Sequence, residues 1–235
     1  MISIGYGRSI TVAANSSHVQ FEDWNSVSDW CDELMCLKPS YVDRINSRLY
    51  PQDAFTMGQM VSKAWMVNVL SALQLPPAQV IAIVGCWIGS AVPHLSQFAT
   101  QRIYGIDCDA ESIELSEQFN QRLVQDNWRY KGVVLDIDHQ QLNDLQFETG
   151  GELIDVKPDW IINTSCEHMS SNWFDTADNS QLIIMQSNNN PQYEGHINIC
   201  ADVAELQHKY PLTQCLYVGS VTTPAYTRFM QIGYK

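Results

Sequence analysis

The chain has 235 residues and a formal net charge of −13, because 26 acidic side chains outnumber 13 basic ones. This balance disfavours nucleic acid and anionic membranes as partners, since both require a basic contact surface. Charged residues make up 17% of the chain, below the roughly 25% that is typical of folded domains. The length suits one α/β domain with an appendage.

The cellular compartment is indicated by apolar runs and cysteines. No apolar run approaches the roughly 20 residues that span a bilayer, and residues 1–17 lack the apolar stretch of a secretory signal. The seven cysteines form no Cys-x-x-Cys pair, and their odd number fits neither a zinc site nor a complete disulfide framework. We therefore expect a cytoplasmic protein with reduced thiols and no resident metal.

Residues 1–75 are predicted to form an N-terminal extension that packs on the core. The last part of it has apolar residues at helical spacing. Pro76 and Pro77 end that helix, because proline cannot donate to the helical hydrogen-bond ladder. Two strands and two helices are predicted in the extension: Ile2–Ile4, Ser9–Ala13, Ser28–Leu37 and Gly58–Leu73.

Residues 76–235 alternate short apolar segments with helical ones. A helix is predicted from the turn after the first strand to about Ala99, and another over Ala110–Gln121, capped by Asp109. The predicted strands are Val80–Val84, Arg102–Ile106, Tyr130–Ile137, Pro158–Asn163, Gln181–Gln186, Gln214–Gly219 and Tyr226–Gly233. The pattern predicts a doubly wound, Rossmann-like sheet of seven strands, mostly parallel, with a C-terminal antiparallel hairpin.

The turn after the first of these strands is bounded by two glycines. Gly85–Gly89 joins a buried strand to a helix, where backbone amides and the helix dipole can receive a ligand. Asp107 ends the next strand, where a carboxylate can accept hydrogen bonds from the two hydroxyl groups of a ribose. The pair indicates a cofactor that carries a nucleoside.

The glycine positions discriminate between cofactors. A dinucleotide fingerprint starting at Gly85 would need glycine at 87 and 90, where the chain has Trp87 and Ser90. A Gly-x-Gly-x-Gly turn needs residues 85, 87 and 89, and two of the three match. Here the chain resembles the class I S-adenosylmethionine-dependent methyltransferases, with Val80–Gly89 as their first motif and Tyr104–Asp107 as their second.

Further segments carry the same resemblance. Val134–Asp138 is similar to the family's third strand, which borders the adenine. More narrowly, the chain is similar to uncharacterised methyltransferase-like proteins of phages and marine bacteria, in these runs: Asn163–Met169, Gln186–Asn190, Gly195–Asn198 and Tyr226–Met230. The resemblance implies S-adenosylmethionine as the cofactor, bound by Gly85, Cys86, Trp87, Gly89, Asp107, Cys108, Asp136 and Asn163.

Two positions depart from the family pattern. Ile83 stands where many members have an acid, and Trp87 replaces the middle glycine. Both changes lie at the amino-acid end of the cofactor. The upstream helix offers compensation through Gln59, Ser62 and Lys63, the last as a point charge for the cofactor's carboxylate. The alternative for Lys63 is an ordinary solvated lysine.

The acceptor site is predicted where the fourth strand ends. Asn163–His168 gathers hydrogen-bonding and titratable groups, and Glu167 or His168 could act as a catalytic base. The alternatives are that Glu167 caps the turn and that His168 is a surface residue. A metal site of Glu167, His168 and His196 is not expected, because adjacent side chains diverge on an extended chain.

Charge narrows the expected acceptor. The stretch from Pro158 to His208, which is expected to wall the acceptor pocket, has seven acidic residues and no lysine or arginine. Arg228 is the basic residue that could still reach this pocket. A phosphate-bearing acceptor, including nucleic acid, is therefore disfavoured, and a neutral or cationic small molecule or a polypeptide is preferred. The sequence predicts methyl transfer; the alternatives are a non-catalytic cofactor-binding protein and a nicotinamide-dependent oxidoreductase. The oligomeric state stays open.

Overall fold

The computed structural model describes residues 51–142, 145–149, 152–223 and 225–235, together with three two-residue strands near the N-terminus. Those strands are β1 (Ile2–Ser3), β2 (Ser9–Ile10) and β3 (His18–Val19). β1 and β2 pair antiparallel, at two of the positions where strands are predicted. The predicted helix Ser28–Leu37 lies outside the described residues.

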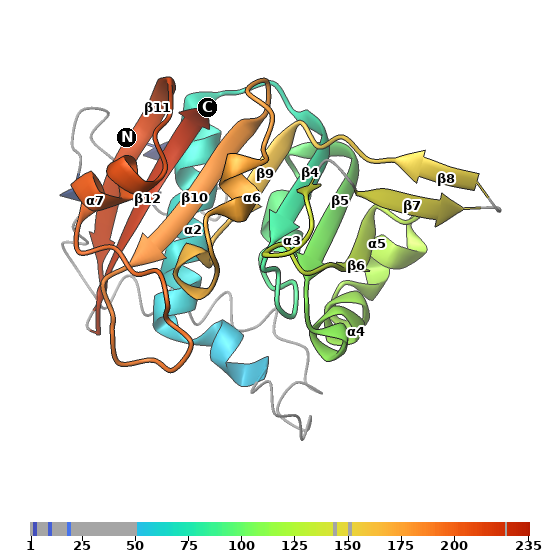
Figure 1. Ribbon diagram of the computed structural model, residues 1–235, viewed down its shortest axis with the longest axis horizontal. Helices are drawn as coiled ribbons and strands as arrows, with labels where there is room; N and C mark the ends of the chain where they lie inside the picture. Colours follow the sequence, from blue (N-terminus) through green and yellow to red (C-terminus); the bar gives the residue numbers. More distant parts are fainter. Residues whose placement is uncertain are drawn as a thin grey trace.

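One large sheet organises the fold (Figure 1). Its strand order is β3-β11-β12-β10-β9-β4-β5-β6. The seven long strands are β4 (Ala78–Val84), β5 (Ala99–Asp107), β6 (Tyr130–Val134), β9 (Trp160–Asn163), β10 (Leu182–Asn188), β11 (Gln214–Thr222) and β12 (Thr227–Tyr234). β6, β5, β4, β9 and β10 are parallel, whereas β12 runs antiparallel to β10 and β11. The predicted seven-stranded sheet is confirmed, and β3 adds a short edge.

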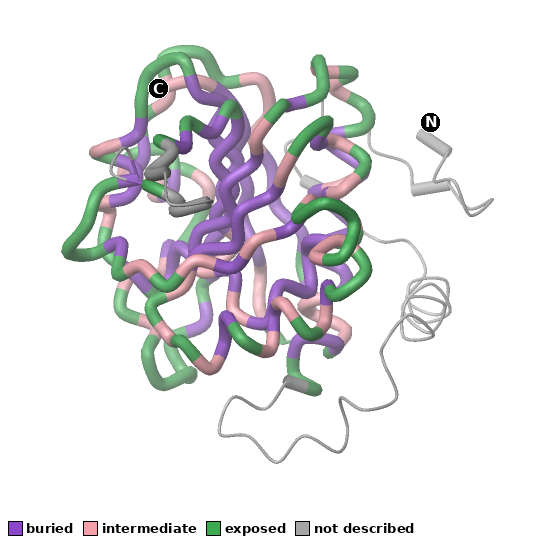
Figure 2. Tube along the Cα trace, turned by 90° about the vertical axis from the view of Figure 1, so that its right-hand side faces the viewer, coloured by how far each residue is buried: buried purple, intermediate pink, exposed green. Residues whose placement is uncertain are grey.

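Helices cover both faces of this sheet. One face carries α2 (Met57–Leu73), α3 (Val92–Leu95), α4 (Ala110–Phe119) and α5 (Gln121–Gln125). The other carries α6 (Asn172–Asp175) and α7 (Val203–Lys209). Viewed from the side, the sheet is the buried centre of the molecule (Figure 2). The architecture is doubly wound, as predicted.

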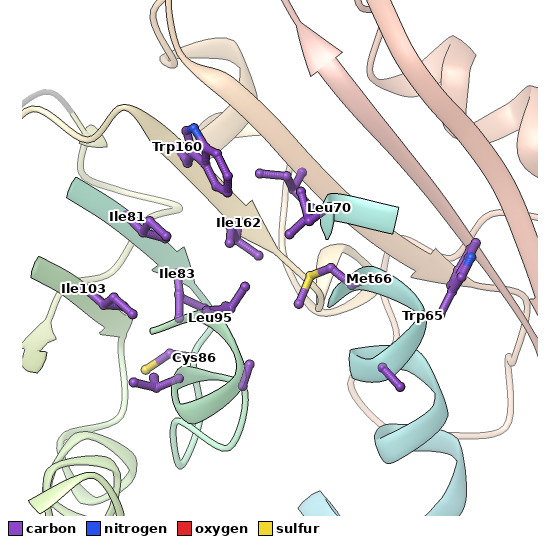
Figure 3. Packing of buried hydrophobic residues seen from close by; sticks show 14 of the residues in the cluster. Trp65, Met66, Leu70, Ile81, Ile83, Cys86, Leu95, Ile103, Trp160 and Ile162 are labelled. Carbon is purple, nitrogen blue, oxygen red and sulfur yellow. The ribbon is translucent and has the colours of Figure 1, made fainter. Parts of the chain in front are cut away.

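The alternation of β4 shows why both faces are covered. Ile81 and Ile83 join one apolar cluster, while Ala82 and Val84 join the other, because successive side chains of a strand point to opposite faces. Figure 3 shows Ile83 on the side of the sheet where α2 packs. Burial of a large aliphatic side chain contributes about 1.5–3 kcal/mol, so the apolar run after Pro77 specifies a central strand.

α2 is the longest helix of the described residues and packs closely on the sheet. Trp65, Met66 and Leu70 are almost fully buried, and Figure 3 shows Met66 and Leu70 beside Ile162 of β9. The helix ends at Gln74, which is left-handed with a φ of 49°. It is preceded by the 3-10 turn η2 (Pro51–Phe55).

Several predicted boundaries are wrong. The helix expected through Ala99 is only α3, because the Ala78 amide donates to the Phe98 carbonyl and draws residues from 99 onward into β5. The helix expected over Ala110–Gln121 breaks at Asn120, whose side-chain amide donates to the carbonyls of Ser116 and Gly89. The strand expected over Tyr130–Ile137 ends at Val134.

Some elements are absent from the sequence prediction. A hairpin of β7 (Gln146–Thr149) and β8 (Glu152–Asp155) extends away from the large sheet (Figure 1). α6 and α7 also lie in stretches where no helix is predicted. No helix in the described part of the chain is both long and apolar enough to cross a membrane.

The topology places the carboxyl ends of β4, β5, β9 and β10 at one edge of the sheet. The chain order reverses between β4 and β9, which are neighbours in the sheet. In open α/β sheets a crevice for ligands opens at such a reversal. The predicted site segments therefore converge at this edge.

Candidate active site

The turn after β4 adopts left-handed dihedrals at alternate positions. The φ angles are 62° at Gly85, 48° at Trp87 and 67° at Gly89. Glycine adopts this conformation freely, whereas a bulky residue there is an outlier. The backbone thus has the geometry of a Gly-x-Gly-x-Gly turn although its middle residue is tryptophan.

Asp107, at the end of β5, is joined to this turn. The Trp87 amide donates to Oδ2 of Asp107 at 2.9 Å, and the Asp109 amide donates to Oδ1 at 3.1 Å. Burial raises the pKa of Asp107, and these backbone hydrogen bonds partly offset the rise. A carboxylate oxygen can accept more than one hydrogen bond, so Asp107 can still receive hydroxyl groups from the open side.

Neighbouring thiols differ in exposure. Cys86 is buried between Gly85 and Trp87, and burial raises the pKa of its thiol. Cys108 is exposed, and its pKa is raised by partial burial and by the charge of Asp107. Neither environment favours a reactive thiolate.

Asp136 follows β6 and faces solvent. Its carboxylate accepts hydrogen bonds from the Asp138 amide at 3.0 Å and pairs with Nδ1 of His139 at 2.8 Å. The hydrogen bond from His139 lowers the pKa of Asp136. The side chain is therefore a fixed acceptor at the end of β6.

Lys63 of α2 is a basic residue near the turn after β4. Its side chain is 5% exposed, and Nζ donates to Oε1 of Gln59 at 3.1 Å and to the Ala54 carbonyl at 3.3 Å. Burial, helped by the charge of Arg228, lowers its pKa to about 7. Lys63 is therefore no solvated surface lysine, which overturns that alternative.

These segments enclose one cavity of about 820 Å³ at the carboxyl edge of the sheet. Ten of the predicted site residues line it: Gln59, Lys63, Gly85, Cys86, Trp87, Asp107, Cys108, Asp136, Glu167 and His168. Ile83 lines it too. A nucleoside-bearing cofactor fits this size, since ligand pockets commonly measure about 300–1,000 Å³.

Three predicted site residues lie outside the cavity lining. Ser62 is buried and donates its hydroxyl hydrogen to Gln186 of β10. Gly89 packs against α4, where a Cβ would meet Asn120 at 2.7 Å. Asn163 is fully buried, and its Oδ1 accepts from the Ser165 amide at 2.9 Å. Each of them supports the wall from behind.

Glu167 lies in the 3-10 turn η4 (Cys166–His168) and is 1% exposed. Its Oε1 accepts from Nδ2 of Asn188 at 2.5 Å and from Nη2 of Arg228 at 3.3 Å. Arg228 also donates to the Thr164 carbonyl at 2.9 Å. Burial lowers the pKa of Arg228, but Glu167, Tyr226 and Cys166 together more than offset this effect, so the pKa is raised.

Two histidines complete the acceptor end. The rings of His168 and His196 meet edge-to-face with centroids 4.5 Å apart. Desolvation lowers the pKa of His168, although its ring is exposed at the cavity wall. The neutral imidazole that results at neutral pH can accept a proton from a ligand.

Only part of this end of the cavity was predictable from the sequence. Arg228 reaches the lining as predicted. Asn188 belongs to the run Gln186–Asn190 but was not predicted as a site residue, yet its side-chain amide donates to Glu167 from the last position of β10. Tyr226 and Tyr193 also line the cavity. The position of Asn188 at a strand end was the available signal, because carboxyl ends converge.

No protein-family profile matches the chain, and no curated protein matches its sequence. Solved structures do match. Magnesium protoporphyrin IX methyltransferase (ChlM) from Synechocystis PCC 6803, solved with bound SAH, superposes with a TM-score of 0.55 at 14% identity, over 88% of this chain and 95% of that one.

The chain therefore has a Rossmann-like methyltransferase fold. The N-methyltransferase NodS from Bradyrhizobium japonicum WM9 matches with a TM-score of 0.53 at 12% identity, over 74% of this chain and 97% of NodS. TehB from Haemophilus influenzae matches with a TM-score of 0.51 at 15% identity, over 73% of this chain and 62% of TehB. The narrower likeness to phage and marine bacterial proteins stays a prediction.

Proposed function

We propose that this chain binds S-adenosylmethionine in the cavity at the carboxyl edge and transfers the methyl group to a small molecule or a polypeptide. The observation that carries the proposal is the hydrogen bond that joins the left-handed turn at Trp87 to Asp107 inside a large cavity. A similar fold holds SAH in ChlM.

The cofactor's parts find matching groups along the cavity. Asp107 accepts hydrogen bonds from the ribose hydroxyl groups, and Asp136 and Cys108 border the adenine. Lys63 receives the carboxylate at the amino-acid end, as an ammonium held between Gln59 and the Ala54 carbonyl. Gly85 lines the cavity and packs closely against Met169, because a Cβ at this position would meet the Met169 side chain at 2.7 Å.

The indole of Trp87 faces the same cavity from the middle of the turn. The ring is partly buried against the apolar cluster below it. Ile83 lines the cavity where many members of the family that the chain resembles have an acid, and Lys63, which lines the same cavity, supplies the polar contact instead.

The acceptor occupies the end lined by Glu167, His168 and His196. Methyl transfer requires an acceptor heteroatom in line with the sulfonium methyl group, and a base where that heteroatom carries a proton. His168 supplies a neutral imidazole there. Glu194 and Asp138 also line the cavity, so a neutral or cationic acceptor suits it better than a phosphate.

The experiment that tests the proposal is transfer of an isotopically labelled methyl group from S-adenosylmethionine to fractionated cell components. We expect label in a small-molecule or protein fraction, and a loss of at least about tenfold in His168→Ala. Cofactor binding without transfer to any fraction would favour a non-catalytic cofactor-binding protein. Label in nucleic acid would contradict the proposed acceptor class.

A further inference from the structure

Three potential metal ligands converge at the acceptor end of the cavity. A carboxylate oxygen of Glu167 and ring nitrogens of His168 and His196 all lie within 4.8 Å of one another. The segment that holds His196 is fixed to η4 by the main chain, because the amides of Ile197 and Asn198 donate to the Glu167 carbonyl at 2.9 and 3.0 Å. The cluster is thus held together by backbone hydrogen bonds.

This arrangement corrects the expectation that Glu167 and His168 diverge. The expectation assumed an extended chain, in which adjacent side chains point to opposite sides. The residues instead belong to the tight turn η4, where that alternation does not apply. His196 then approaches from a separate loop and completes the group.

One carboxylate oxygen of Glu167 accepts hydrogen bonds, and the other has no hydrogen-bond partner. Oε1 accepts from Asn188 and Arg228, whereas Oε2 is buried without any hydrogen-bond partner. A buried charged oxygen without a partner costs free energy, so native proteins rarely keep one unless a ligand satisfies it. The Oε1 contacts orient the carboxylate as outer contacts do in metal sites.

The two imidazoles are also prepared for ligation. Nδ1 of His196 lies 2.6 Å from the Asn190 carbonyl, so it carries the proton and leaves Nε2 with a free lone pair. His168 makes a backbone hydrogen bond with Gly195, and its ring lies beside that of His196, with centroids 4.5 Å apart. Backbone hydrogen bonds of this kind orient the histidines of metal sites.

We propose that Glu167, His168 and His196 bind a divalent first-row transition-metal ion at the acceptor end of the cavity. Two imidazoles and one carboxylate suit Zn²⁺, Mn²⁺ or Fe²⁺. Because the protein supplies three ligands, further coordination positions face the cavity and are open to water or to the acceptor. Arg228 opposes the cation's charge, while Glu194 and Asp138 of the same lining favour it.

The proposed ion requires no cofactor for binding, so it is tested on protein without S-adenosylmethionine, although His168 belongs to both proposals. Metal-free protein is titrated with Zn²⁺ by calorimetry and with Co²⁺ by visible absorption, which reports nitrogen and oxygen ligation separately from thiolate ligation. We expect one ion per chain, without the thiolate band. His168→Ala and His196→Ala should each weaken binding at least tenfold.

Two variants serve as controls. His208→Ala removes an exposed histidine of α7 outside the cavity lining, and Cys108→Ser removes the exposed thiol within it. Both variants should bind Zn²⁺ and Co²⁺ with the affinity of the wild type. Circular dichroism verifies that each variant is folded, and the two histidine variants carry the test because Glu167→Gln also breaks a buried ion pair.

The proposal is overturned by any of three results. These are no binding of Zn²⁺ or Co²⁺ by the metal-free protein, wild-type affinity in both histidine variants, and loss of binding in Cys108→Ser. None of these results bears on cofactor binding at the other end of the cavity. Likewise, a failure to transfer methyl groups would leave the titration unaffected.

Discussion

The Trp87 amide donates a hydrogen bond to Oδ2 of Asp107 at 2.9 Å. This contact links the turn after β4 to the end of β5, the two segments at which a nucleoside is expected to bind. Trp87 has a φ of 48°. The hydrogen bond therefore holds Trp87 in a left-handed conformation, which is unfavourable for residues with a Cβ atom. Strain of this kind is common at functional sites.

A matched pair of substitutions tests that conformation. Trp87→Gly and Trp87→Ala remove the same indole but differ in their tolerance of a positive φ. A left-handed residue with a Cβ costs about 1–2 kcal/mol, so Trp87→Gly should be the more stable variant by about 1 kcal/mol in urea unfolding. Where φ is negative, a glycine variant is normally less stable than the alanine variant. If Trp87→Gly proved less stable than Trp87→Ala, residue 87 would not be left-handed.

Asp107→Asn should weaken binding of SAH. The substitution keeps an acceptor for one backbone amide but replaces one charged oxygen with a donor. Hydrogen bonds to charged groups contribute about 1.5–3 kcal/mol, so we expect roughly 10- to 100-fold weaker binding by calorimetry. Asp126→Asn, at an exposed residue outside the cavity, is the control and should bind as wild type does. Equal affinities of the two variants would remove Asp107 from the site.

Lys63 should make stability depend on pH. Its pKa is lowered from 10.5 to about 7 by burial and by the charge of Arg228. Between these values the unfolded chain binds a proton that the folded protein releases, so the free energy of unfolding rises with pH, by up to about 1.4 kcal/mol per unit. Below pH 7 both states are protonated and the dependence ends.

Urea unfolding of wild type and Lys63→Met at pH 7 and pH 9 measures this effect. The stability of wild type relative to the variant should increase between the two pH values, because the variant lacks the titrating group. Lys157→Met, at an exposed position, should follow the wild type. A difference between wild type and Lys63→Met that does not change with pH would mean that Lys63 has an ordinary pKa.

The buried ion pair of Glu167 and Arg228 should be strongly coupled. The two side chains are 1% and 4% exposed, and removal of one partner leaves a buried charge. We expect Glu167→Gln to cost about 3–5 kcal/mol of unfolding free energy. The double variant Glu167→Gln, Arg228→Met should lose less than the sum of the single changes.

The exposed pair of Asp126 and Arg129 provides the comparison, with atoms 3.6 Å apart. Asp126→Asn should change stability by less than about 1 kcal/mol, because exposed pairs are solvated and screened. Additive effects in the Glu167 and Arg228 cycle, measured by urea unfolding, would contradict a direct interaction between them.

The sheet was predictable from the sequence because its strands are apolar and flanked by turn residues. Val80–Val84 lies within β4, and the hairpin of β11 and β12 falls where the last two strands are expected. The glycine turn and Asp107 were also predicted as lining, since the order of elements fixes which strand ends meet. These features depend on local patterns and on topology.

The remaining features depend on contacts between distant residues. α3 is short because pairing of Ala78 with Ala99 competes with the helix, which no local periodicity reveals. The convergence of His196 on Glu167 depends on a loop held by backbone hydrogen bonds. The burial of Ser62 against Gln186 likewise follows from how α2 packs on β10.

The most direct test of the cofactor site is a crystal structure of the protein grown with SAH. We predict that the ribose hydroxyl groups lie about 3 Å from the Asp107 carboxylate, that the amino-acid end approaches Lys63, and that the sulfur faces the end lined by Glu167 and His168. An indole of Trp87 occupying the cofactor's place, with SAH absent from the cavity or bound elsewhere, would contradict the account.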